Sequence, residues 1–347
     1  MVRFGRAHGT DRRLLVTGLG GVPSQRALNV VLAPDSEAHR RVRPPRPAAP
    51  AQPGSAHLAA GFQPQPAWNL ADSGGRTISD LVFVNRYVGP AGAWSATDMA
   101  SIDTGLSKAM SDANLETVIQ QYFPAPISSR MLPSITHVTT LGATAYKDTI
   151  ESLAAELHAG GAIGAADPAS TVINILLPPG VVLSDDFSPG FTPPAGQQEA
   201  HEHRRAGTIK LDPDDAADSK HGLGGYHGSI HGAGGATVYY AAGVYSEGSN
   251  GIAVFDQPWK NVVATFYHEL NEARTDADVE DVNRAGSAAS LGWYSQTGQG
   301  EIGDLPINEA SDITKVFVEV ALADGTGTVP IQLMWSNNDS GPAASTG

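Results

Sequence analysis

The stretch Thr171–Leu177 (TVINILL) decides the fold of this chain, because it is a continuous apolar run rich in β-branched residues. Pro178-Pro179-Gly180 bounds the run, and both its length and its boundary are typical of a strand that is buried on both faces. Such a strand lies in the centre of a sheet that is covered by helices. The chain around it is therefore predicted to be α/β or α+β.

Strand and helix patterns alternate on both sides of this run. Asp80–Tyr87 predicts a strand that ends before Gly89-Pro90, and Ser95–Asp98 is a capping box that predicts a following helix. Apolar stripes predict further helices over 115–122 and 146–157, and strands are expected over 238–245, 252–255, 316–320 and 331–335. We expect a mixed sheet flanked by helices.

The first 75 residues have a different composition from the rest, being rich in Pro, Ala, Arg and Gly. We predict a disordered leader over residues 1–75, with Arg40–Pro66 as a Pro/Ala linker, and a single folded domain over 76–347. Arg12-Arg13 before a short apolar run leaves open a degraded twin-arginine export signal, although the short run favours an ordinary leader. Residues 184–225 are polar and are predicted to form a surface insertion.

Charge and cysteine content exclude several functions. Residues 1–50 hold nine Arg and three acidic residues, whereas the remainder holds 13 basic and 33 acidic residues, which argues against nucleic-acid binding. The chain has no cysteine, so disulfides, thiolate zinc sites and thiol nucleophiles are excluded. No apolar run is long enough to span a bilayer, and we expect no transmembrane segment.

Asn261–Asp276 contains the string His268-Glu269-Leu270-Asn271-Glu272 and predicts one amphipathic helix. Positions four apart share a helix face, so His268 and Glu272 project together, with Glu269 beside them. A His and a carboxylate on one rigid helix, next to a second Glu, is how zinc hydrolases hold a metal and a general base. Here the second ligand is Glu instead of His. The domain is therefore predicted to be zincin-like.

A hydrolytic zinc site needs three protein ligands and one open position. We predict His268, Glu272 and Glu301 as the metal ligands, with Asp276 and Asp304 as alternatives for the third place, Asp304 also being a possible orienting residue. Glu269 is the predicted catalytic base. Two carboxylates with one imidazole also suit calcium or manganese, so the cofactor prediction is zinc with those two ions left open.

His227 and His231 lie in the glycine-rich stretch 225–232, which favours a loop. His227 is kept as a candidate catalytic residue that contacts the substrate or the oxyanion. The alternative for the His-Glu string is an exposed helix face with solvated charges, in which Glu272 pairs with Arg274 or Lys260. The clean apolar side of the helix and the nearby segment from Trp293 to Asp304 favour the metal site.

The body from Ile78 to Trp335 resembles the EXORDIUM / phosphate-induced protein 1 family and its bacterial relatives. The similar motifs are Gly225–Gly228 (GYHG), Tyr239–Ala241 (YYA), Thr275-Asp276, Gly292–Tyr294 (GWY) and Leu333–Trp335 (LMW). Ala277 replaces the family's Pro, the family's cysteines are absent, and many plant members lack the His-Glu pair. The resemblance implies a secreted, extracellular protein connected with growth, while a cytoplasmic location stays open. The positions that it carries over are Tyr226, His227, Thr275, Asp276, Trp293 and Glu301.

Three hypotheses follow from the sequence. The first is a metal-dependent hydrolase of the zinc metallopeptidase type, acting on a peptide or protein substrate. The second is a non-catalytic extracellular binding or growth-related protein that keeps a degenerate metal site. The third is a domain that calcium merely stabilises. The oligomeric state does not follow from these patterns.

Overall fold

The structure is a computed structural model that describes residues 58–192, 218–232, 235–281 and 291–343. It also describes the short strands β1 (Leu15–Thr17), β2 (Pro23–Gln25) and β3 (Val30–Leu32). Except for these three strands, the predicted leader up to residue 57 lies outside the described residues.

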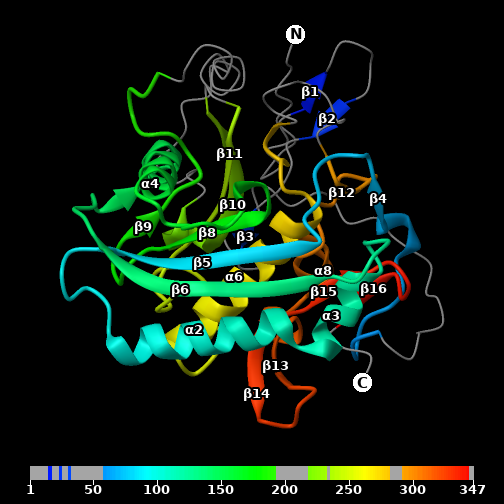
Figure 1. The fold of residues 1–347 in the computed structure, drawn as a ribbon. Helices are drawn as coiled ribbons and strands as arrows, with labels where there is room; N and C mark the ends of the chain where they lie inside the picture. The colour runs from blue at the N-terminus through cyan, green and yellow to red at the C-terminus, as the bar shows by residue number, and fades with distance from the viewer. Residues whose placement is uncertain are drawn as a thin grey trace.

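A mixed sheet forms the centre of the fold (Figure 1). Its order is β3-β10-β11-β8-β5-β6. The bounds of the five long strands are Leu223–His231 for β10, Thr237–Gly243 for β11, Thr171–Leu176 for β8, Asp80–Gly89 for β5 and Ser128–Val138 for β6. Strands β11, β8, β5 and β6 run parallel, whereas β10 is antiparallel to β11 and β3 is antiparallel to β10. The predicted mixed sheet flanked by helices is confirmed.

Strand β8 separates two apolar cores, as its sequence predicts, because side chains alternate between the faces of a strand. Val172 and Leu176 pack into the core on one face, whereas Ile173 and Ile175 pack into the core on the other. All residues of β8 are buried. The continuous apolar run is therefore explained by two helical layers, one on each face of the sheet.

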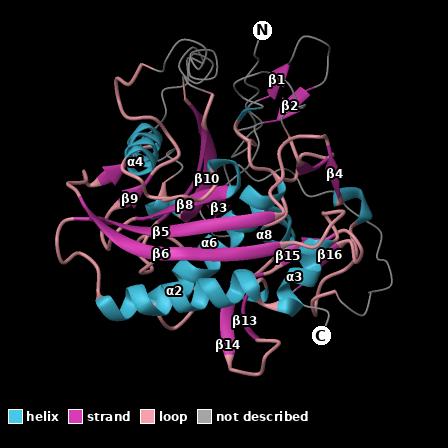
Figure 2. Cartoon of the chain, viewed as in Figure 1, coloured by secondary structure: helices cyan, strands magenta, loops and turns pink. Residues whose placement is uncertain are grey.

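Helices α2 (Ala96–Ser111) and α6 (Pro258–Thr275) cover one face, and α4 (Lys147–Ala159) covers the other (Figure 2). The predicted capping box is confirmed, since the Ser95 side chain accepts a hydrogen bond from the Asp98 N–H. Helix α4 ends at Gly160 as expected. The short helix α3 (Ala113–Gln120) follows α2, and Asp112 caps its N-terminus.

Smaller elements surround the central sheet. Strand β14 (Thr328–Gln332) pairs with β13 (Phe317–Ala321) and packs against α6, and the short helix α8 spans Asp304–Glu309. The other short strands form pairs: β12 (Trp293–Ser295) with β4 (Leu70–Asp72), β15 (Met334–Ser336) with β16 (Gly341–Ala343), and β7 (Thr144–Ala145) with β9 (Val182–Leu183). Single 3₁₀ turns occupy Pro66–Trp68, Pro168–Ser170, Ser219–His221 and Ile313–Lys315.

Several sequence predictions need correction. The folded body begins before residue 76, because Phe62, Trp68 and Leu70 lie in the same core as α2 and α6. The strand predicted over 252–255 is wrong: the N–H groups of Val254 and Phe255 donate to the Asn261 side chain at the start of α6 instead of to a neighbouring strand. The long strand β6 was not predicted, since its alternation is interrupted by Pro133.

The boundaries of the predicted insertion also change. Residues 193–217 lie outside the described part of the chain, but 218–225 form a 3₁₀ turn and the start of β10. Ser219 is buried there, and its hydroxyl accepts a hydrogen bond from the Leu183 N–H. Among the described residues, no helix combines the length and the apolar character that crossing a membrane requires.

Candidate metal centre

The polar face of α6 is turned into the protein. His268, Glu269 and Glu272 have no exposed surface, because β10, β14 and α8 surround this part of the helix. The alternative of a solvated helix face is therefore wrong. The pairing partners that it requires are engaged elsewhere: Arg274 donates to the Ser128 carbonyl and the Ser129 hydroxyl, and Lys260 pairs with Asp256 and Glu319.

The side chain of His227 lies next to Glu269 and Glu272 of α6. It comes from strand β10, whereas the sequence favoured a loop at this position. One of the glycines that favoured a loop, Gly225, instead allows a close approach between strand and helix. A Cβ atom at Gly225 would lie 2.9 Å from Thr265 Cγ2 and 3.0 Å from Glu269 Oε1, both on α6, and 2.8 Å from the Ala242 carbonyl oxygen on β11. The absence of a side chain at Gly225 lets α6 sit directly against β10, and this brings His227 to Glu269 and Glu272.

The ring of His227 is held in one tautomer. Its Nε2 lies 3.2 Å from the backbone oxygen of Asp276, which can only accept, so Nε2 carries the hydrogen. Nδ1 faces Glu269 Oε2 at 3.5 Å and Glu272 Oε2 at 3.6 Å. Burial lowers the pKa of His227 to about 3, so the imidazole is neutral and turns the lone pair of Nδ1 toward these carboxylates.

The ring of His268 is fixed by Gln332 of β14. The amide nitrogen of Gln332 donates to the Gly303 carbonyl at 2.7 Å and to the Leu333 carbonyl at 2.8 Å, which leaves its Oε1 to accept from Nδ1 of His268. Burial lowers the pKa of His268 to about 4. The lone pair of its Nε2 then faces Glu272 Oε1, only 3.0 Å away and outside hydrogen-bonding geometry.

Glu272 and Glu301 are carboxylates with unused acceptor oxygens. Glu272 Oε1 accepts from the N–H groups of Gly303 and Asp304, both at 3.1 Å. Within the described ranges, Glu272 Oε2 and both oxygens of Glu301 accept no hydrogen bond. Burial raises the pKa of both side chains, and for Glu301 the charge of Glu272 raises it further. Uncompensated carboxylates in such a place would take up protons or bind a cation.

These side chains form two possible ligand groups that share Glu272. One consists of His227, Glu272 and Glu301, and the other of His268, Glu272 and Asp304, with one ligand atom per residue and all such atoms of a group within 4.8 Å of each other. The predicted ligands Glu272 and Glu301 thus come together with His227, whereas the predicted ligand His268 shares Glu272 but is grouped with Asp304 in place of Glu301.

The remaining candidates stand around these groups. Glu269, the predicted base, lies beside His227. Asp276 ends α6 and accepts from the Gly292 N–H at 2.8 Å, and it belongs to neither group. Asp304, predicted as an alternative third ligand or as an orienting residue, is a potential ligand at the first position of α8. Gln332 was not foreseen, and no sequence motif marks it.

The charge of the centre is not balanced by nearby basic side chains. In the described ranges, no Lys or Arg forms an ion pair with Glu272, Asp276, Glu301 or Asp304. The buried Lys147 is bound to Asp185 at 2.9 Å and to Glu280 at 3.0 Å. Buried carboxylates with neutral imidazoles are the chemistry of a site for a divalent cation.

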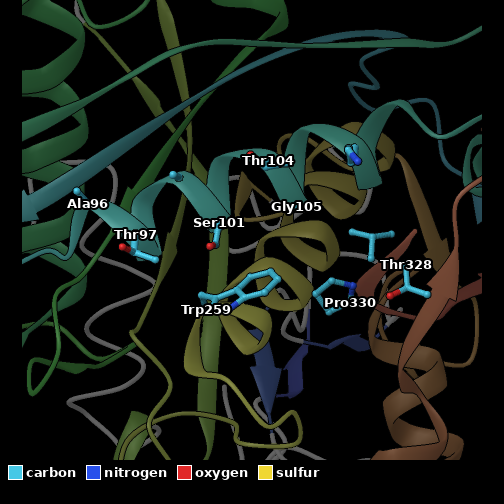
Figure 3. Close-up of a pocket in the computed structure, with 11 residues that line it drawn as sticks. Ala96, Thr97, Ser101, Thr104, Gly105, Trp259, Thr328 and Pro330 are labelled. Atoms are coloured by element: carbon cyan, nitrogen blue, oxygen red, sulfur yellow. The ribbon is translucent and has the colours of Figure 1, made fainter. Parts of the chain in front are cut away.

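A separate groove of about 650 Å³ lies between α2, the start of α6 and β14 (Figure 3). Small side chains of α2 and the ring of Trp259 line it, together with Thr328 and Pro330. None of its lining residues belongs to the candidate metal centre.

Comparison of the chain with protein-family models, with curated proteins and with solved structures gives no match. The resemblance to the EXORDIUM family, and the extracellular location that it implies, therefore stay predictions.

Proposed function

We propose that the protein is a metal-dependent hydrolase with a divalent cation bound by His227, Glu272 and Glu301, and that its substrate is a peptide or protein. The observation that carries the proposal is Glu301, whose side chain has no exposed surface and whose oxygens accept no hydrogen bond from the described residues. Such a carboxylate is stable when a cation completes its surroundings. Zinc is the first expectation, and the two carboxylates also suit manganese.

The chain supplies a base for hydrolysis and a backbone carbonyl that orients one proposed ligand. A bound cation would polarise a water molecule and lower its pKa. Glu269, on the same face of α6 as Glu272, would take a proton from that water while the water oxygen forms a bond to the substrate carbonyl carbon. The C–N bond then breaks, and Glu269 returns the proton to the leaving amine. The Asp276 carbonyl holds the orientation of His227 throughout.

Two matched substitutions test the proposal. Glu301→Gln keeps the size of the side chain and removes the charge, so it should lower bound metal, measured by elemental analysis after reloading. Glu156→Gln, on α4 with a side chain that is 64% exposed, is the control and should leave the metal content unchanged. Glu269→Gln should keep the metal but lose peptide turnover by a factor on the order of 100 or more. Equal metal in wild type and Glu301→Gln would refute the proposed site.

One observation favours the third hypothesis, a cation with a purely structural role. Every ligand of the proposed site has no exposed surface, and catalysis needs access for a substrate. In that case the cation would serve to hold β10, α6 and the segment before α8 together. A melting temperature that falls on chelation, together with undetectable hydrolysis of a diverse peptide library by the metal-loaded protein, would support this alternative.

A further inference from the structure

Glu272 stands between two imidazole rings, with one ring at each of its oxygens. Nδ1 of His227 lies 3.6 Å from Oε2, and Nε2 of His268 lies 3.0 Å from Oε1. The other nitrogen of each ring is a donor, to the Asp276 carbonyl and to Gln332 respectively. Both rings therefore direct a lone pair at the same buried carboxylate, an arrangement that is repulsive without positive charge on each side.

A single proton cannot relieve both contacts. If Oε2 of Glu272 were protonated, Oε1 would still oppose the lone pair of His268. Oε1 is in addition fixed in place by the N–H groups of Gly303 and Asp304. A positive charge is therefore needed at each oxygen of Glu272 to offset its repulsion with the facing imidazole. Two cations, one bound at each oxygen, would supply these charges.

We propose that the centre is dinuclear, with Glu272 as the bridging ligand. The first cation is the one of the proposed function, on which this inference rests, and the second is bound by His268, Glu272 and Asp304. The ligand atoms of each group lie within 4.8 Å of one another, which fits a shared ion with bonds of about 2.0–2.4 Å. One imidazole and two carboxylates on each side suit first-row divalent ions such as Mn²⁺.

The charge of the whole centre agrees with a second cation. Four carboxyl groups that form no ion pair with a Lys or Arg of the described residues are buried here: Glu272, Asp276, Glu301 and Asp304. One divalent ion would leave much of this charge uncompensated in the interior, and a pair of ions would bring it close to neutrality. Two ions about 3.5–4 Å apart also form a known catalytic arrangement, in which both the attacking and the leaving atom are stabilised.

The experiment is metal titration of the full-length protein with Mn²⁺ after chelation. Elemental analysis should give two Mn²⁺ per chain for the wild type, and electron paramagnetic resonance should show a spin-coupled pair and not isolated ions. Asp304→Asn should lower the content to one uncoupled Mn²⁺, and Asp256→Asn, with a side chain that is 68% exposed, is the matched control. His231→Ala removes a separate surface group formed with Asp278 and Asp281, and it should leave the coupled signal unchanged.

The possible results separate the two proposals. Saturation at one Mn²⁺ that Glu301→Gln abolishes would overturn the dinuclear centre and leave the proposed function standing. No bound Mn²⁺ or Zn²⁺ in the wild type would overturn both. Two uncoupled ions, of which one is lost in His231→Ala, would place the second ion at the surface and would also overturn the dinuclear centre. The wild-type spectrum decides even where Asp304→Asn fails to fold.

Discussion

The side chain of Gln332 holds the ring of His268 although the two residues are 64 positions apart in the chain. Both donor hydrogens of the Gln332 amide go to backbone carbonyls, so its oxygen faces Nδ1 of His268 and fixes the position of the ring hydrogen. A hydrogen bond to the ring nitrogen that does not face the metal orients a metal-binding histidine and raises its basicity. The contact thus sets His268 up as a ligand through Nε2.

Gln332→Met tests this orientation. Methionine has a similar volume, but its thioether sulfur is a much weaker acceptor than an amide oxygen, so the tautomer of His268 would no longer be firmly held. We expect the affinity for the second Mn²⁺ to fall about 10–100-fold, as is usual when such a partner is removed. Competition with a fluorescent chelator measures the affinity. Gln121→Met, which removes a side chain that bonds to Val118 and Ser336, is the control, and an equal loss of affinity there would contradict the prediction.

Gly303→Ala tests the close packing beside the same ring. A Cβ atom at Gly303 would overlap the ring of His268, which cannot move without leaving Gln332. We expect a loss of about 1–3 kcal/mol in the free energy of unfolding, together with weaker metal binding. Gly232→Ala is the control, because among the described residues its Cβ atom would meet only the Ala236 carbonyl, at 3.4 Å. Urea unfolding measures both variants, and similar values for the two would count against the predicted overlap.

The metal-free protein should depend on pH in a defined direction. Burial raises the pKa of Glu301 above its ordinary value of 4.5 in the folded protein. Without a cation, the stability contributed by the protonated form is therefore full below the unfolded pKa and is lost as the pH rises through the folded pKa. A bound cation favours the ionised form and offsets this loss.

We therefore expect a chelator to lower the melting temperature more at about pH 8 than at about pH 5.5. In Glu301→Gln the difference between the two pH values should shrink, because the glutamine does not titrate. Differential scanning calorimetry with and without chelator measures the four conditions. A chelator effect that is larger at the lower pH would contradict the assignment.

The sequence predicted the spacing of residues within one helix of this centre better than the contacts between segments that are distant in the chain. The spacing of His268 and Glu272 on one helix follows from helical geometry, and it was correctly placed on α6. His227 was named as a candidate catalytic residue, but it was expected in a loop because of its flanking glycines, whereas it lies on β10, where the approach of α6 leaves no room for a side chain at Gly225. The regrouping of His227 with Glu301 depends on contacts between distant segments, which periodicity does not contain. Gln332 was missed for the same reason.

The predicted start of the folded body near residue 76 was wrong because it rested on local composition, which does not show contacts between distant segments. Trp68 lies in a Pro- and Ala-rich stretch, yet its ring stacks on Trp335 with a centroid distance of 6.1 Å. The backbone N–H of Trp335 donates to the carbonyl of Ile302 at 2.8 Å, and Ile302 directly follows Glu301. The segment before residue 76 therefore supports the loop that carries a proposed ligand.

Trp68→Ala should destabilise the protein by about 3–5 kcal/mol, since the ring is fully buried. It should also weaken binding of the first cation, because Trp335 would lose the surface that holds it against Ile302. Trp259→Ala, at the separate groove, is the control and should change stability less and leave metal affinity unchanged. Denaturant unfolding and metal titration measure the two effects. A destabilised Trp68→Ala protein with unaltered metal affinity would show that the segment 58–75 supports the core without positioning Glu301.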